Sequence, residues 1–350
     1  MQVDLSHRQI YDTQRRLDRV ATETTLGRQR SHTMERTTST RFKRLLFIAL
    51  APAFLAEIGS GNTPLAALAD PRVDLFLTLA YGFPLLIISE LRTRLRLGDA
   101  GVFLLGLAYG FINEGLLAQT LIRFDNVPIA EFNEYLYVAG FNLAWTALIV
   151  CWHAFISVLF PLALADSWFR DNAGRPVLSD RVFLLLGATL AAAIAFLGIV
   201  RTPHPQMLAC AVAIGLLTLS AMVFPAHDKD SIAAQPRFKH FLFGFIAFHA
   251  TLITAIAMAH ARVSPALYFG WFALAALVLF GSGRRRGIAP PLRSAALAQG
   301  VYASLGAFHA LVGFFGLHSI AETLVGIAFA TPFVVCAVTA DRLPRQAAEG

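Results

Sequence analysis

The hydrophobic positions of this chain gather into about ten long segments separated by short polar stretches. Most segments approach the ~20 apolar residues that a helix needs to cross a bilayer. They run roughly over residues 45–59, 74–89, 100–122, 137–164, 182–200, 206–225, 240–260, 264–281, 295–316 and 319–340. The pattern predicts an all-α polytopic membrane protein, a helical bundle of about ten transmembrane helices.

The positions of the basic residues support this number of segments. Of the 29 Lys and Arg residues, 25 fall in the two terminal stretches and the alternate loops that would share one side of the membrane with them. The other side receives only Arg72, Arg123, Arg201 and Arg262. Because cytoplasmic loops carry the excess of Lys and Arg, this split predicts cytoplasmic N- and C-termini in a multi-pass protein of the cell membrane, of the bacterial inner-membrane kind.

Composition narrows the class of protein further. Hydrophobic residues make up 56% of the chain and charged residues only 15%, against roughly 25% charged residues in soluble domains. The net charge of +7 suggests nucleic acid as a partner, but the basic residues lie in short loops between spans. We therefore expect the lipid bilayer, and no nucleic acid, as a partner.

Three cysteines, Cys151, Cys210 and Cys336, all lie in apolar stretches, which predicts neither a disulfide framework nor a cysteine-based zinc site.

The chain divides into a basic tail, residues 1–43, a transmembrane domain, residues 44–341, and a short tail, residues 342–350. The N-terminal tail has no sustained apolar period, so we expect it to be disordered and cytoplasmic. Translation could begin at Met1 or at Met34. An alternative interpretation treats Leu45–Ala56 as the apolar part of a signal peptide, with Ala67-Leu68-Ala69 as its cleavage site.

Four ionisable side chains fall near the middle of four different segments: Glu114, His153, His249 and His309. A carboxylate or imidazole at bilayer depth is costly, so such residues usually face a bundle interior or a cavity and mark functional sites. With a rise of ~1.5 Å per residue, all four lie in one thin slab of the membrane. The sequence does not say which helices are neighbours.

These residue types suit several kinds of chemistry. A desolvated carboxylate can activate water, and imidazoles can orient that water, hold a divalent metal such as zinc, or relay protons. We therefore expect Glu114, His153 and His249 as catalytic residues. His153, His249 and His309 are the candidate ligands of a zinc ion. Asn113, Asn142 and Ser157 are expected to support the site.

The stretch Gly110-Phe-Ile-Asn-Glu114, followed by His153, resembles the core of the CAAX-protease and bacteriocin-processing family of intramembrane proteases. That family carries E-E-x-x-x-R, F-x-x-x-H and H-x-x-x-N on successive helices. Here Asn113 replaces the first Glu and Ala118 stands at the Arg position, while Ser157 replaces the Asn after His153. Phe245-Ile-Ala-Phe-His249 matches F-x-x-x-H further along the chain. The resemblance covers residues 100–165 and implies that Glu114 activates water with the support of His153 and His249.

Three functions remain open from sequence alone. The first is an intramembrane hydrolase, active or degenerate, that acts on a membrane-embedded peptide. The second is a secondary transporter or permease for a small solute, which the proline-interrupted segments near Pro52, Pro84 and Pro161 favour. The third is a non-catalytic membrane scaffold or a haem-binding protein. Whether the protein is an enzyme, and its oligomeric state, are not decided by the sequence.

Overall fold

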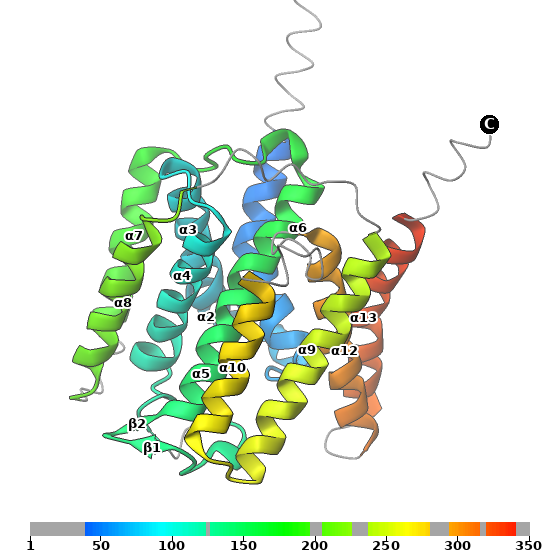
Figure 1. Cartoon of the computed structure of the whole chain (residues 1–350). Coiled ribbons are helices and arrows are strands. Elements are labelled where there is room, and N and C mark those ends of the chain that lie inside the picture. Colours follow the sequence, from blue (N-terminus) through cyan, green and yellow to red (C-terminus); the bar gives the residue numbers. More distant parts are fainter. Residues whose placement is uncertain are drawn as a thin grey trace, which may run out of the picture.

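The computed structural model describes residues 39–123, 127–196, 205–225, 237–280, 294–315 and 320–340. Within these ranges, ten apolar helices run up and down through a bundle (Figure 1), as the hydrophobic pattern predicts. Six are long and apolar enough to cross a membrane: Pro71–Arg94, Asp99–Leu117, Leu143–Trp168, Phe238–His260, Ala295–Phe314 and Ile320–Thr339. Shorter apolar helices cover Met207–Ala221 and Pro265–Val278.

The first half of the chain carries most of the irregular helical turns. A first helix covers residues 39–53. It is followed by η1 (Phe54–Ile58), η2 (Leu65–Ala69), α2 (Pro71–Leu77), η3 (Thr78–Gly82), α3 (Phe83–Arg94), α4 (Asp99–Gly110), η4 (Phe111–Leu117), η6 (Ala130–Phe132), the strands β1 (Tyr137–Val138) and β2 (Phe141–Asn142), α5 (Leu143–Trp152), η7 (His153–Leu159), α6 (Phe160–Trp168) and η8 (Arg170–Asn172). The two strands pair antiparallel, with Tyr137 opposite Asn142.

The second half is built of longer regular helices. These are α7 (Asp180–Ile194), α8 (Met207–Ala221), α9 (Arg237–His260), α10 (Pro265–Phe280), α12 (Ala295–Phe314) and α13 (Ile320–Ala340). Glycines bring α9, α12 and α13 close together. A Cβ atom on Gly300 of α12 would stand 2.0 Å from the carbonyl oxygen of Phe241, and one on Gly326 of α13 would stand 2.7 Å from that of Gly306. Small residues at such contacts are the usual means by which membrane helices approach each other.

The first helix begins earlier than the hydrophobic pattern indicates. Residues 39–43, which we expected to belong to a disordered tail, are helical. Arg41 and Arg44 explain this extension, because both donate hydrogen bonds to carbonyl oxygens of the stretch that joins η8 to α7. Arg41 Nη2 lies 3.0 Å from the Val177 oxygen, and Arg44 Nη1 lies 2.7 Å from the Asn172 oxygen. Residues 1–38 and 341–350, and with them most of both expected tails, lie outside the described residues.

Ionic contacts close the end of the bundle at which the first helix begins, which we call the N-terminal face. Asp166 on α6 accepts hydrogen bonds from two arginines, Arg44 of the first helix at 3.1 Å and Arg92 of α3 at 2.5 Å. Glu90 accepts the backbone N–H groups of Val177 and Leu178 at 2.6 and 2.9 Å. These bonds tie the first helix, α3 and α6 together at one level.

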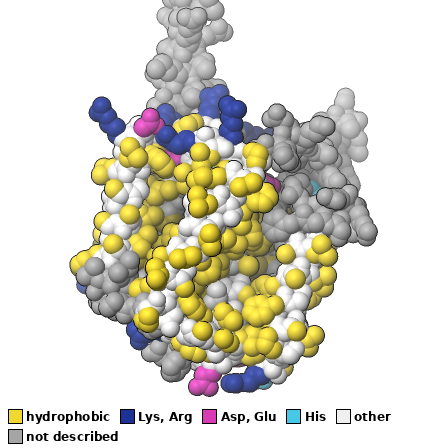
Figure 2. Space-filling model, turned by 60° about the vertical axis from the view of Figure 1, so that its left-hand side comes forward, with side chains coloured by type: hydrophobic (Ala, Val, Ile, Leu, Met, Phe, Trp, Pro, Cys, Tyr) yellow, Lys and Arg dark blue, Asp and Glu magenta, His cyan; other side chains and the backbone are white. Residues whose placement is uncertain are grey.

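The lateral surface of the bundle matches a membrane environment. Figure 2 shows hydrophobic side chains spread over the middle of the visible face, with Lys and Arg side chains at its two ends. Large apolar side chains such as Leu184, Leu208 and Ile320 are more than 65% exposed. Exposed apolar area of this extent marks surfaces that contact lipid or another protein. The described residues therefore form an all-α membrane protein.

Candidate functional site

Glu114 and His153 meet inside the bundle. Glu114 lies on η4, which continues α4, and His153 begins η7 between α5 and α6. The Nε2 atom of His153 lies 2.9 Å from the Oε1 atom of Glu114. Glu114 is 9% exposed and His153 only 1%. The structure thus joins two of the residues that the sequence singled out into one buried acid–base pair.

Two glycines on α4 allow this approach. A Cβ atom on Gly106 would stand 2.6 Å from the Cα atom of Ala154, and one on Gly110 would stand 2.9 Å from the Cα atom of Val150. Gly106, Gly110 and Glu114 are spaced four residues apart, so they follow one side of the helix. The close glycine contact therefore sets the carboxylate of Glu114 directly against the segment that carries His153.

Both members of the pair have a further hydrogen-bond partner. Thr120 donates its hydroxyl to Oε2 of Glu114, and the indole N–H of Trp145 donates to Thr120 Oγ1 at 2.9 Å. On the other side, Ser157 Oγ lies 3.1 Å from His153 Nδ1. Both carboxylate oxygens and both ring nitrogens are therefore partnered, as buried polar groups require.

A second carboxylate is connected to the pair through Tyr81. The hydroxyl of Tyr81, on η3, donates to Glu57 Oε1 on η1, and Thr63 Oγ1 donates to Glu57 Oε2 at 2.8 Å. The ring of Tyr81 lies against that of His153, with 5.9 Å between centroids. Thr63 is half-buried, between the exposed residues Asn62 and Pro64. A chain of polar side chains thus leads from a surface loop towards the buried pair.

Tyr109 and Asn113 complete the surroundings of the imidazole. The Tyr109 ring meets His153 edge-on, with centroids 5.2 Å apart. Asn113 Nδ2 donates to the Tyr109 hydroxyl oxygen at 3.2 Å. Asn113 therefore reaches the surroundings of His153 indirectly, through Tyr109.

The four central residues of this network all lie on π-helical turns. These turns are η1, η3, η4 and η7, and they carry Glu57, Tyr81, Glu114 and His153 respectively; elsewhere in the described part of the chain, residues 195–196 are also π-helical. π-Helical turns make up well under 1% of residues in proteins and occur frequently at functional sites. Four of them around one cluster single out this cluster as the candidate site.

Prolines account for two of these turns. Pro84 follows η3 and Pro161 follows η7. Proline lacks an N–H group and leaves a carbonyl of the preceding turn without its helical donor. Tyr109 donates its hydroxyl to the carbonyl oxygen of Ala80 at 2.8 Å, four residues before Pro84. In the same way, Tyr302 donates to the carbonyl oxygen of Ile156 at 2.7 Å, five residues before Pro161.

His249 belongs to a different contact. It lies on α9, and its Nδ1 atom is hydrogen-bonded to the hydroxyl of Ser304 on α12. The rings of Phe245 and Phe308 flank it, with centroids 5.2 and 6.3 Å away. The contacts of His249 therefore join α9 to α12, and it lies apart from the polar network that joins Glu114 and His153.

His309 also forms a separate pair. Its Nε2 atom lies 3.0 Å from Oε2 of Glu322 on α13, and the loop residue Gly61 lies directly over its ring. Across the described ranges, no three His, Cys, Asp or Glu side chains are grouped so that they could hold a metal ion. The expected convergence of His153, His249 and His309 on one zinc ion is thus not seen, because each imidazole is bonded to a residue of a different helix.

Asn142 acts as a helix cap. Its Oδ1 atom accepts the backbone N–H of Trp145 at 2.9 Å, and its Nδ2 atom donates to the Phe132 carbonyl at 2.7 Å. Such caps satisfy donors at a helix start that have no partner within the helix. Asn142 thereby fixes the start of α5, and Trp145 in turn bonds Thr120. Its support of the site is indirect.

Several residues of the site were missed by the reasoning from sequence. Tyr81, Tyr109, Thr120 and Trp145 carry no motif that would single them out, and Glu57 lies at the end of its apolar segment rather than near the middle. One signal was available in Gly106-x-x-x-Gly110-x-x-x-Glu114, because small residues four apart predict a close helix contact on the side that carries the acid.

Fold and site together define a polytopic helical membrane protein with a buried carboxylate–imidazole centre. The chain belongs to the uncharacterized membrane protein family, whose model matches residues 45–345. Comparisons with curated proteins and with solved structures found no match.

The family match corrects one of the expectations from sequence. It assigns residues 45–345 to this family and not to the CAAX-protease and bacteriocin-processing family. The short patterns around Glu114, His153 and His249 therefore do not assign the chain to the protease family. The geometry agrees with this correction, since His249 is bonded to Ser304 and lies outside the pair that its proposed role required.

Proposed function

We propose that this protein is a proton-coupled secondary transporter in which Glu114 and His153 bind the coupling proton. The observation that carries the proposal is the 2.9 Å contact between these two groups in the interior of the bundle. Ionisable residues within membrane spans pair with one another and mark proton relays in pumps and transporters. A carboxylate and an imidazole bonded to each other can share one proton and release it when the environment changes.

The burial of the pair favours proton transfer over chemistry on a substrate. With exposures of 9% and 1%, neither Glu114 nor His153 offers a surface for a solute to contact. A proton needs only a chain of hydrogen-bonding groups. Hydrogen bonds link Thr63, Glu57 and Tyr81 from the loop between η1 and η2 inward, and the ring of Tyr81 lies against the ring of His153 at the end of this route.

Among the described residues, the polar route reaches the pair from one end of the bundle, an arrangement that suits alternating access. The polar route starts at the loop that holds Thr63, at the end of the bundle remote from the N-terminal face. At the N-terminal face, the contacts of Asp166 with Arg44 and Arg92 hold three helices together. Release of the proton at that face would require these contacts to open, and the π-helical turns η3 and η7 lie between the pair and the contacts. Turns of this kind are places where a helix can bend.

Transport can be tested in proteoliposomes that enclose a pH-sensitive dye. A potassium diffusion potential, negative inside, should drive proton uptake in the presence of a transported solute, and amino acids, sugars, nucleosides and organic cations form the panel. Glu114→Gln should abolish the uptake. Glu322→Gln is the matched control, because Glu322 also pairs with a histidine but lies outside the network. A panel without any solute-dependent uptake, or equal uptake by the Glu114→Gln variant, would contradict the proposal.

A hydrolase is the second candidate, and Ser157 is the observation that favours it. Ser157, His153 and Glu114 are hydrogen-bonded in sequence, at 3.1 and 2.9 Å. A hydroxyl, an imidazole and a carboxylate in this order are the elements of an activated nucleophile. A fluorophosphonate probe distinguishes the two functions. Labelling that disappears in Ser157→Ala would establish the hydrolase, and an unlabelled protein that transports would exclude a reactive Ser157.

A further inference from the structure

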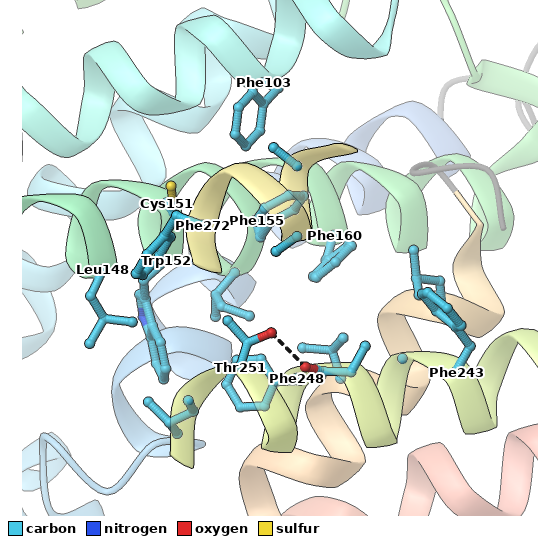
Figure 3. Close-up of a pocket in the computed structure, with 18 residues that line it drawn as sticks. Phe103, Leu148, Cys151, Trp152, Phe155, Phe160, Phe243, Phe248, Thr251 and Phe272 are labelled. Atoms are coloured by element: carbon cyan, nitrogen blue, oxygen red, sulfur yellow. Dashed lines mark hydrogen bonds between the residues drawn. The ribbon is translucent and has the colours of Figure 1, made fainter. Parts of the chain in front are cut away.

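A partly open cavity of about 160 Å³ lies between α4, the α5–η7–α6 segment, α9, α10 and α12. Figure 3 shows aromatic side chains from these elements turned towards it. The largest of them are Phe103, Trp152, Phe155, Phe160, Phe248 and Phe272. Trp152 precedes His153 in the chain, so one side of the η7 region faces the cavity while His153 turns to Glu114. The cavity is therefore distinct from the polar network.

The lining of this cavity is suited to hydrocarbon. Its one hydroxyl group, on Thr251, donates to the Ala247 carbonyl of its own helix at 2.8 Å, as the dashed line in Figure 3 marks. The remaining side chains are aromatic, aliphatic or, in Cys151, a thiol. A dry apolar cavity of ~150 Å³ takes up benzene in a well-studied protein. The cavity here can therefore accept a stretch of hydrocarbon of about that bulk.

One end of the cavity lies near a positively charged side chain, that of Lys239. Phe243 and Leu297 line it near the start of α9 and of α12. Lys239 lies four residues before Phe243, or ~6 Å along the helix, and its side chain is exposed. No acidic residue occurs in α9 or in α12, so nothing on these two helices offsets this charge. Basic residues at a membrane surface attract the headgroups of anionic lipids.

We propose that this cavity binds one acyl chain of an anionic phospholipid from the surrounding bilayer, with the headgroup next to Lys239. The apolar aromatic walls select the chain, and the charge at the start of α9 selects the headgroup. This site is independent of proton binding at Glu114 and His153, and either proposal can fail without the other.

Trp152 provides the measurement, because bromine atoms on a lipid chain quench indole fluorescence on contact. The protein is reconstituted in phosphatidylcholine with a small fraction of chain-brominated phosphatidylglycerol. Trp152→Phe identifies the part of the signal that comes from Trp152. The expected result is saturable quenching of Trp152, at least about tenfold more effective with brominated phosphatidylglycerol than with brominated phosphatidylcholine, which corresponds to about 1.4 kcal/mol.

Four variants make the assignment specific. Ala247→Phe places a ring in the cavity and should abolish the saturable quenching, and Ala276→Phe provides the same test if the first variant does not fold. Ala273→Phe is the matched control, because Ala273 lies on the exposed side of α10. The fluorescence of this variant should be quenched like that of the wild type. In Lys239→Gln the brominated lipids should still quench Trp152, but brominated phosphatidylglycerol should no longer be more effective than brominated phosphatidylcholine. Equal quenching by both brominated lipids in the wild type, or unchanged quenching in both cavity-filling variants, would overturn the proposal.

Discussion

Gly106 lies so close to Ala154 that a Cβ atom on the glycine would stand 2.6 Å from the Cα atom of the alanine. This contact sets the distance between α4 and the segment formed by α5 and η7. Two turns further on, on the same side and in η4, which continues α4, Glu114 reaches His153. The buried pair is therefore a consequence of helix packing as much as of the two side chains themselves.

Replacing Gly106 with leucine should separate these helices. Overpacking of a well-packed interior costs about 1–3 kcal/mol, and here it would also lengthen the contact between Glu114 and His153. Unfolding by SDS in mixed micelles measures the loss of stability. Gly187→Ala is the control, because a Cβ atom at Gly187 on α7 meets nothing within 4 Å. Equal stability of the Gly106 variant and the wild type would contradict the close packing.

Removing the hydroxyl of Tyr109 should destabilise the protein in a way that depends on Pro84. In Tyr109→Phe the Ala80 carbonyl loses the donor that bonds it at 2.8 Å, and an unsatisfied buried acceptor costs about 1–3 kcal/mol. In a Pro84→Ala background a backbone N–H is available to that turn, so the same substitution should cost less. The double-mutant cycle gives the difference directly. Additive effects would show that the proline and the tyrosine act independently.

The two substitutions Glu114→Gln and Glu114→Ala should differ clearly in stability. Glutamine keeps an acceptor for the Thr120 hydroxyl and a hydrogen-bonding partner for Nε2 of His153, whereas alanine removes both of these partners. Removing one member of a buried ionic pair costs about 3–5 kcal/mol, so we expect a loss of that order for alanine and a smaller one for glutamine. Thermal unfolding in detergent compares them. Equal melting temperatures for the two variants would mean that the carboxylate position makes no buried contacts.

Tyr81→Phe should slow the exchange of protons between solution and the pair. The substitution removes the hydroxyl that donates to Glu57 and so interrupts the polar route from Thr63. Stopped-flow proton uptake by reconstituted protein should fall by about tenfold or more, equivalent to a barrier higher by ~1.4 kcal/mol. Tyr135→Phe serves as the control, because the Tyr135 hydroxyl donates to the Val263 carbonyl outside this route. Uptake as fast as that of the wild type would remove Tyr81 from the path.

The turn after η4 carries a strained residue next to the site. Gln119 has a φ of 59°, in the left-handed region that costs a residue with a Cβ atom roughly 1–2 kcal/mol, and it precedes Thr120. Glycine at this position should therefore be tolerated, and valine should lower stability by about 1–2 kcal/mol because its branched side chain suits this region least. Chemical unfolding curves of the two variants compare these effects. A valine variant as stable as the glycine variant would argue against this backbone conformation.

The sequence predicts the helices well because a helix that crosses a bilayer must satisfy its backbone internally and present apolar side chains outward. All ten expected segments are helical in the described residues. The β1–β2 hairpin and the π-helical turns are not evident from hydrophobicity, since they depend on individual hydrogen bonds. The bond from Tyr109 to Ala80, for example, joins residues that are distant in sequence. The extension of the first helix to residue 39 depends on contacts of Arg41 and Arg44 that are distant in sequence.

The site could be predicted only in part. Depth in the bilayer drew attention to Glu114 and His153, which the structure brings together, but depth says nothing about which helices are neighbours. His249 and His309 lie at similar depth and pair with Ser304 and Glu322 instead. Side-chain periodicity fixes the face of a helix on which a residue lies, while the partner of that face is decided by small residues such as Gly106 and by the shapes of the facing helices.

The central claim is that Glu114 and His153 share a proton that exchanges with solution. Infrared difference spectra of the lipid-reconstituted protein, recorded between acidic and alkaline pH, test this most directly. The account predicts a carboxylic acid band that is present in the wild type and absent in Glu114→Gln. In His153→Gln the pH at which this band appears should shift, and in Glu322→Gln the band should be unchanged. Identical difference spectra for the wild type and Glu114→Gln would contradict it, because Glu114 would then not change its protonation at all.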